Sequence, residues 1–152
     1  MEKTNLFLDD RTDKVTKQIL ENVIMRKQKF DFYKQRHIRV MWITVFLSFL
    51  YFLYLYFTII KVYSFSFTAM FSAFVADSNN LMFLIITVGM YGYMNLLREK
   101  MDKAEADFHA LRCEIVDRSK DLWKKEDAWE NRHIIFEMMK EKYDINLYHE
   151  KK

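Results

Sequence analysis

Residues 40–97 form an almost uncharged block of 58 residues between two charged flanks. The block contains only two charged side chains, Lys61 and Asp77, which divide it into uncharged runs of 21, 15 and 20 residues. A helix needs about 20 consecutive apolar residues to cross the hydrocarbon core of a bilayer, because each residue adds about 1.5 Å. The first and third runs therefore predict membrane-spanning helices at 40–60 and 81–97.

The basic residues beside the two predicted spans indicate their orientation. Nine of them lie on the terminal sides of the spans: Arg26, Lys27, Lys29, Lys34, Arg36, Arg39, Arg98, Lys100 and Lys103. The connection at 61–80 offers Lys61 alone. Because cytosolic segments carry the excess of Lys and Arg, we expect both termini in the cytosol and the connection outside. The predicted fold is an all-α transmembrane helical hairpin of two spans, with long amphipathic cytosolic helices at both ends.

Residues 62–76 are too few to cross the bilayer, and two arrangements remain open for them. Aromatic residues alternate with Ser and Ala here, which favours an external segment lying at the membrane interface. The alternative is a longer first helix that continues past Lys61, whose amine then reaches the headgroups, and that turns near residues 77–80. Gly89 and Gly92 lie three residues apart in the second span, where they either allow close packing against the first span or face lipid.

The C-terminal flank, 98–152, has an apolar residue at every seventh position. The repeat consists of Met101, Phe108, Ile115, Leu122, Trp129, Phe136 and Tyr143. Three residues later come Ala104, Leu111, Arg118, Lys125, Arg132 and Met139 in turn. The spacing predicts an amphipathic helix that continues from the second span and fades near Tyr143, with a complete coiled-coil seam for two heptads.

Local pairs and the last residues add to this picture of the C-terminal flank. Acidic residues precede basic ones by four positions at Glu99–Lys103, Glu114–Arg118 and Asp121–Lys125, which supports a helix. Asp144 and Asn146 are candidate helix breakers. The short tail that begins here still offers apolar surface at Tyr143, Ile145, Leu147 and Tyr148, so we expect it either to dock back onto the arm or to bind a partner.

The N-terminal flank, 1–39, has a similar stripe at spacings of three and four residues. The stripe consists of Thr16, Ile19, Val23, Arg26, Phe30, Tyr33, His37 and Val40. Asp10 or Thr12 is placed to cap this helix, which would run into the first span. Two arms that leave the membrane side by side predict either an antiparallel pair within one chain or a seam between two copies. Basic residues on the stripes, such as Arg118, require such a seam to stay partly hydrated.

Charge and cysteine content exclude several classes of protein. The flanks carry net charges of +4 and −1, and the whole chain carries +3, which is too little for a nucleic-acid-binding domain. Cys113 is the only cysteine, so the chain has no intrachain disulfide and no zinc site built from several cysteines. The four histidines, His37, His109, His133 and His149, have no second ligand at a spacing typical of metal sites.

We identify no catalytic, cofactor-binding or metal-binding residues in the sequence, because the motifs of phosphate-binding loops, serine hydrolases and zinc peptidases are absent. Apart from tyrosine, the polar residues of the spans are Thr44, Ser48, Thr58, Thr87 and Asn95. Ser and Thr hydroxyls can bond to their own helix backbone, so these residues need no partner in another helix. Ion pathways normally include ionisable groups, and the two predicted spans contain no Asp, Glu, Lys, Arg or His.

We therefore expect a non-enzymatic membrane protein with a structural or interaction role. Its partners would be the lipid bilayer and, through the cytosolic arms, a second copy or another protein, with no nucleic acid and no small-molecule substrate. The alternative is a subunit of a small oligomeric channel or transporter.

Two stretches of the chain carry a resemblance to a known family. They are the basic residues that lead into Met41 and Trp42, and the segment from Trp129 through Glu137 to the ending EKYDINLYHEKK. These stretches are similar to the YpbF-like family of uncharacterised two-span membrane proteins of Bacillus-type bacteria. The resemblance covers most of the chain and implies a bacterial plasma membrane. It implies no activity and transfers no functional residues.

Overall fold

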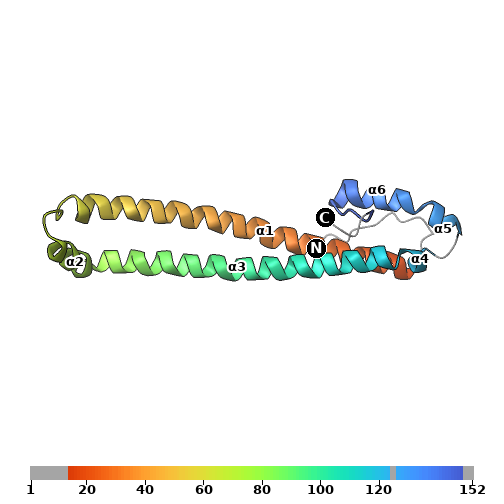
Figure 1. Cartoon of the computed structure of the whole chain (residues 1–152), viewed down its shortest axis with the longest axis horizontal. Helices are drawn as coiled ribbons and strands as arrows, with labels where there is room; N and C mark the ends of the chain where they lie inside the picture. Colours follow the sequence, from red (N-terminus) through yellow and green to blue (C-terminus); the bar gives the residue numbers. More distant parts are fainter. Residues whose placement is uncertain (1–13, 124–125, 149–152) are drawn as a thin grey trace. The chain divides into compact units, whose positions relative to one another are not determined.

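A computed structural model of the chain describes residues 14–123 and 126–148, and every regular element in this part is a helix (Figure 1). In chain order the elements are α1 (Lys14–Leu55), the π-helix η1 (Tyr56–Ile60), α2 (Phe67–Ala76), α3 (Ser78–Asp117), α4 (Ser119–Leu122), α5 (Glu126–Glu130) and α6 (Arg132–Tyr143). The all-α prediction is confirmed for the described residues. Asp10, Thr12, Lys125 and His149, singled out in the sequence, lie outside them.

The chain divides into two compact units. The span unit is Lys34–Lys100, and the arm unit joins Met1–Tyr33 to Met101–Lys152. Both long helices contribute a stretch to each unit, so each charged arm continues into an apolar run, as predicted. The chain contains no proline, the residue that most strongly interrupts a helix.

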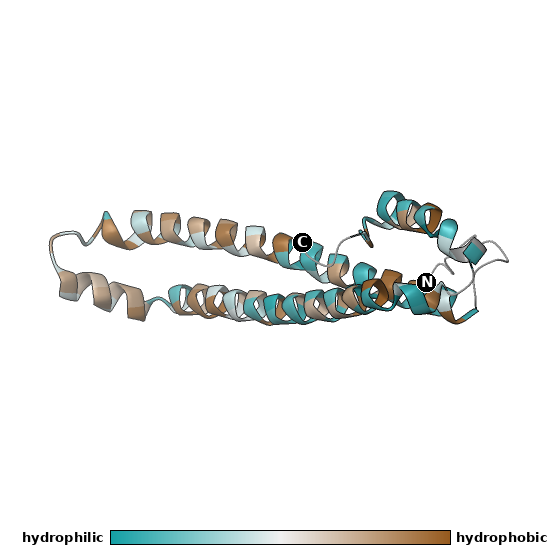
Figure 2. Cartoon of the chain, turned by 45° about the vertical axis from the view of Figure 1, so that its right-hand side comes forward, coloured by the Kyte–Doolittle hydropathy of each residue, from teal (hydrophilic) through white to brown (hydrophobic). Residues whose placement is uncertain are grey.

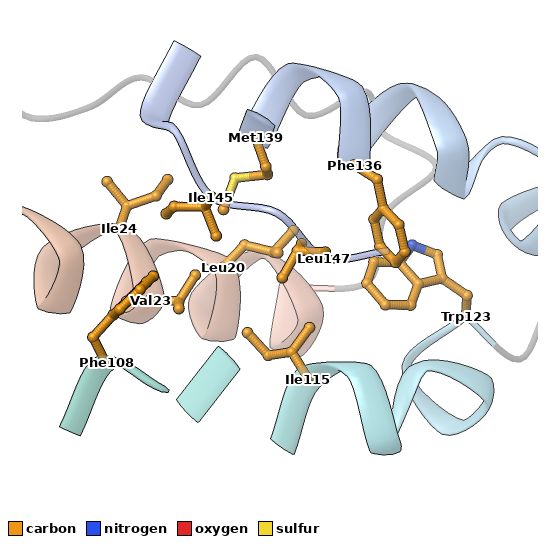
Figure 3. Packing of buried hydrophobic residues seen from close by; sticks show 10 residues of the cluster. All are labelled: Leu20, Val23, Ile24, Phe108, Ile115, Trp123, Phe136, Met139, Ile145 and Leu147. Carbon is orange, nitrogen blue, oxygen red and sulfur yellow. The ribbon is translucent and has the colours of Figure 1, made fainter. Parts of the chain in front are cut away.

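In the arm unit, the first stretch of α1 lies between α3 on one side and α6 with its tail on the other. Figure 3 shows Val23 beside Phe108 of α3, and Ile24 beside Ile145 of the tail. The buried core consists of Leu20, Val23, Ile24, Phe108, Ile115, Trp123, Phe136, Met139, Ile145 and Leu147. Because α1 is covered on two sides, it buries two neighbouring rows of side chains and not the single stripe that the sequence predicted.

The C-terminal arm is broken into several helices, which corrects the expectation of one helix up to Tyr143. Arg118 and Asn131 leave the helical conformation, with φ/ψ of −90°/12° and −87°/0°. The seven-residue repeat nevertheless predicts burial correctly, since none of its seven residues is exposed. The breaks allow α6 and the tail to cover a side of α1 that α3 does not reach.

The end of α6 confirms the predicted break at Asp144. This residue adopts a left-handed conformation, with φ of 55°, which Asp tolerates better than most residues do. Its backbone N–H donates to the carbonyl oxygen of Lys140 at 3.1 Å, and that of Ile145 donates to Met139 at 3.0 Å. The chain thereby reverses, and the tail docks back onto the arm.

In the span unit, the first helix ends at Ile60 and a turn follows, so no single helix continues past Lys61. Ser66 caps the separate helix α2, because its side chain accepts a hydrogen bond from the Ala69 N–H at 3.4 Å. A Cβ added at Gly89 or Gly92 would meet no atom within 4 Å, so neither glycine packs closely against α1.

Candidate functional site

The tail after α6 closes the core of the arm unit. Ile145 and Leu147 are 0% and 1% exposed. The hydroxyl of Tyr148 donates to the carbonyl oxygen of His133 at 3.2 Å, and its ring meets Phe136 edge-on at 5.4 Å. Burying an aliphatic side chain of this size contributes roughly 1.5–3 kcal/mol. The tail is therefore part of the folded arm unit and not an appendage to it.

Lys27 connects α1, α3 and the tail. Its ammonium lies 3.5 Å from the carboxylate of Asp31 and 3.4 Å from that of Asp144. The same group lies 5.7 Å and 5.6 Å from the ring centroids of Phe30 and Phe108, which are stacked with their planes 1° apart. The Lys27 side chain is 13% exposed, so two carboxylates and two aromatic rings replace most of its water.

The stripes of the two arms pack against each other within one chain. Arg26 pairs with Asp107 at 2.7 Å, and the Thr16 hydroxyl donates to the carbonyl oxygen of Leu122 at 3.1 Å. Successive contacts run forward along α1 and backward along the C-terminal arm, so the pair is antiparallel. The Arg26 side chain stays 47% exposed, which agrees with the expected hydration of basic residues on the stripe. A seam between two copies stays a prediction.

Four polar side chains of the span unit form a cluster that we call the polar clamp: Tyr51, Tyr54, Asp77 and Asn80. The Tyr51 hydroxyl donates to the backbone oxygen of Asn80 at 3.2 Å, and the Tyr54 hydroxyl donates to the Asp77 carboxylate at 3.1 Å. Both tyrosines also contact the ring of Phe83. The clamp therefore joins the last turns of α1 to the first turns of α3.

The polar clamp also organises the start of α3 and the end of α2. The Asp77 carboxylate accepts the N–H of Asn79 at 3.0 Å and so caps α3. The Asn80 amide donates to the carbonyl oxygen of Phe74 at 3.4 Å. The residue patterns in the sequence did not predict the clamp. The available signal was a pair of tyrosines three residues apart on one helix face, with an acid and an amide at the same spacing.

The remaining residues singled out in the sequence are not brought together. The hydroxyls of Thr44, Thr58 and Thr87 donate to carbonyl oxygens four residues earlier at 2.8, 2.7 and 2.8 Å, as predicted. His109 pairs with Glu105 of its own helix at 3.6 Å. Arg118, the residue that follows α3, pairs with Glu114 at 3.1 Å, which confirms this predicted pair.

No ligand site emerges from the titratable side chains. Among residues 14–123 and 126–148, no group of three or more His, Cys, Asp or Glu side chains is placed to hold a metal ion. The arrangements present hold helices and the tail together. The candidate functional features are therefore the arm unit with its docked tail, the polar clamp and the surfaces of the apolar helices.

In the part of the chain that the structure describes, these features define an all-helical protein with two helices, Lys14–Ile60 and Ser78–Asp117, that are long and apolar enough to cross a membrane. A family model described as "Protein of unknown function (DUF2663)" matches residues 19–150, and the chain belongs to this family. The chain is 38% identical over 145 residues to the "Uncharacterized protein YpbF" of Bacillus subtilis (strain 168), covering 95% of each protein. The similarity to the YpbF-like family noted in the sequence is confirmed as a family relationship. No solved structure matches the chain.

Proposed function

We propose that this protein is an integral membrane protein with two spans that presents a folded cytosolic helical module for contacts with other proteins. The observation that carries the membrane assignment is the exposure of the apolar helices. In the most apolar stretch of each helix, 17% of the residues of Lys14–Ile60 and 11% of those of Ser78–Asp117 are buried. A core helix of a soluble protein buries most of such a stretch, whereas lipid would cover these side chains here.

Individual side chains support the same assignment. Trp42, Phe46 and Phe52 of α1 are 66%, 63% and 69% exposed, and Ile85 of α3 is 71% exposed. Exposed apolar side chains of this size, repeated along helices without charge, are costly in water and favourable in hydrocarbon. The polar clamp supports a hairpin, because it links the last turns of α1 to the first turn of α3.

The interaction role is supported by the arm unit. The apolar stripes of its two arms pack against each other within the chain, so a partner would contact the remaining surface of the arm unit. Met25 and Phe32 lie seven residues apart on α1 and are 55% and 53% exposed. Residues at this spacing share a helix face, and exposed apolar groups on one face are typical of contact sites. We propose that partners bind the arm unit near these two residues.

Membrane topology is testable with single cysteines. In intact cells, a Ser72→Cys variant that also carries Cys113→Ser should react with a membrane-impermeant maleimide. The native Cys113 should react only after the membrane is permeabilised, because the positive-inside bias places the arms in the cytosol. Reaction of Cys113 in intact cells without labelling at position 72 would overturn the orientation.

The interaction role needs a separate experiment in native membranes. A photo-crosslinking amino acid at Met25 or Phe32 should give a discrete crosslinked product, and one at Lys34, which is exposed on the opposite face of the same helix, serves as the control. An identical pattern from all three positions would contradict a specific contact face. Channel activity, the alternative suggested by the sequence, would instead appear as ion flux in proteoliposomes of the purified chain.

A further inference from the structure

We propose that α2 binds the outer surface of the phospholipid bilayer with a defined orientation. Phe67, Phe71 and Val75 would enter the acyl-chain boundary, while Thr68 and Ser72 would face the headgroups and water. This inference rests on the proposed membrane integration, because it takes the two apolar helices as spans. It assigns a partner, the lipid bilayer, and an orientation to α2, whose exposed apolar side chains are not covered by the described residues.

The exposed side of α2 consists of two rows of different chemistry. Residues four apart share a helix face, so Phe67, Phe71 and Val75 form one row, with exposed fractions of 79%, 61% and 48%. The neighbouring row contains Thr68, Ser72 and Ala76, which are also exposed. The exposed side of α2 thus has one row of bulky apolar residues and one row of small residues, of which Thr68 and Ser72 are polar.

Four residues of α2 face other parts of the span unit. Ala69, Met70, Ala73 and Phe74 are half-buried, and none of the ten residues of α2 is fully buried. This side rests near η1, with which α2 makes tertiary contacts. The row of Phe67, Phe71 and Val75 therefore does not pack against the described residues, so another molecule must shield it from water.

The position of α2 between the two long apolar helices indicates that lipid shields this row. Residues 62–76 carry no charge, and α2 is apolar along its length in Figure 2. A ten-residue helix is about 15 Å long and cannot cross the membrane. The chain enters α2 from η1 through a six-residue turn, and the Asn80 hydrogen bond to Phe74 holds its other end to α3. Tethered to two spans, α2 cannot leave the membrane surface.

Adjacent cysteines on α2 test the orientation. Phe71→Cys and Ser72→Cys are made separately in the full chain with Cys113→Ser, labelled with a polarity-sensitive fluorophore and reconstituted into phosphatidylcholine vesicles. Lipids with a nitroxide near the top of the acyl chain quench a probe at that depth. We expect at least about twofold stronger quenching at position 71, because interfacial helices bury one face to about 5–10 Å. Phe67→Cys and Thr68→Cys repeat the comparison one turn earlier.

A probe at Ile85→Cys separates this inference from the proposed membrane integration. Position 85 lies in the second apolar run and should be quenched by nitroxides deeper in the acyl chain. Quenching at 85 with equal or absent quenching at 71 and 72 would overturn the proposal for α2 alone, as would stronger quenching at 72. Absence of quenching at all three positions would overturn membrane integration itself.

Discussion

At the scale of single residues, Ile145 tests whether the tail is part of the fold. It is 0% exposed against α1 and α6, so Ile145→Ala should lower the free energy of unfolding by about 2–4 kcal/mol through lost burial and a residual cavity. Ile134→Ala is the matched control, because Ile134 is 56% exposed and should change stability by less than about 0.5 kcal/mol. Urea unfolding of the full chain in detergent, followed by tryptophan fluorescence, measures both. Equal effects would mean that the tail does not dock.

Lys27 is the second residue with a measurable role. Lys27→Met keeps an apolar stem but removes the charge beside Asp31, Asp144 and the two stacked rings. We expect a loss of about 1 kcal/mol, since a partly exposed ion pair and a cation–π contact each contribute about 0.5–1 kcal/mol. Part of this loss should disappear at high salt, which screens the ion pairs.

The control for Lys27 lies two positions further along the same helix. Lys29 is exposed, and Lys29→Met should leave the urea midpoint nearly unchanged. A loss of the same size in both variants would assign the effect to net charge and not to the contacts of Lys27.

The core shows what residue patterns can and cannot predict. Phe108, Ile115 and Phe136 are buried as the seven-residue repeat predicts, because helical periodicity marks one face directly. Leu20 and Ile24 fall outside the predicted stripe of α1 and are nevertheless buried. Their burial depends on α6 and the tail returning to α1, a contact between distant segments that local periodicity does not encode.

At the scale of elements, the polar clamp holds the end of α1 to the start of α3. Tyr54→Phe removes the hydroxyl that donates to the Asp77 carboxylate and should lower stability by about 1–2 kcal/mol. Tyr56→Phe is the control, since Tyr56 is 50% exposed in η1 and the same change should have little effect. Thermal unfolding in detergent compares the two variants. A shift of equal size in both would contradict a specific role for the clamp.

Gly89 and Gly92 provide a test of helix packing in α3. An added Cβ meets no atom within 4 Å at either position, so Gly89→Ala and Gly92→Ala should be tolerated. Each should stabilise the helix by up to about 1 kcal/mol, because alanine has the higher helix propensity. Thermal unfolding of each variant measures the sign. A clear loss of stability would show that another surface, such as a second copy, approaches these glycines.

The helical elements were predictable to different degrees. The continuity of each arm with an apolar run followed from the sequence, because no residue there disfavours helix strongly. The break after Asp117 was not predictable from the sequence, since the apolar repeat continues through it without a change of period. The interruption allows the chain to return along α1, so tertiary packing overrides a local preference for helix. For residues 62–76 the pattern left open an interfacial segment or a longer first helix; the structure contradicts the longer first helix, and the helical form of α2 was not predicted.

At the scale of the whole molecule, the pairing of the arms can be tested by exchanging charges. Arg26→Asp places a like charge beside Asp107 and should lower the stability of the full chain by up to about 1 kcal/mol. Adding Asp107→Arg to the same chain should restore most of the loss, because the pair is re-formed with reversed polarity. The variants are compared by thermal unfolding in detergent, at low salt so that screening does not hide the effect.

Co-expression then distinguishes pairing within a chain from pairing between chains. When the Arg26→Asp and Asp107→Arg chains are produced together, each still carries its own mismatch, so arms that pair within a chain gain nothing from the partner. Thiol-specific crosslinking at Cys113, which is half-buried in α3, should then give no dimer in membranes. Restored stability in the mixture, together with a crosslinked dimer, would show that the two stripes meet between copies. The arm unit would in that case be the dimerisation module of the protein, and its core would be shared between two chains.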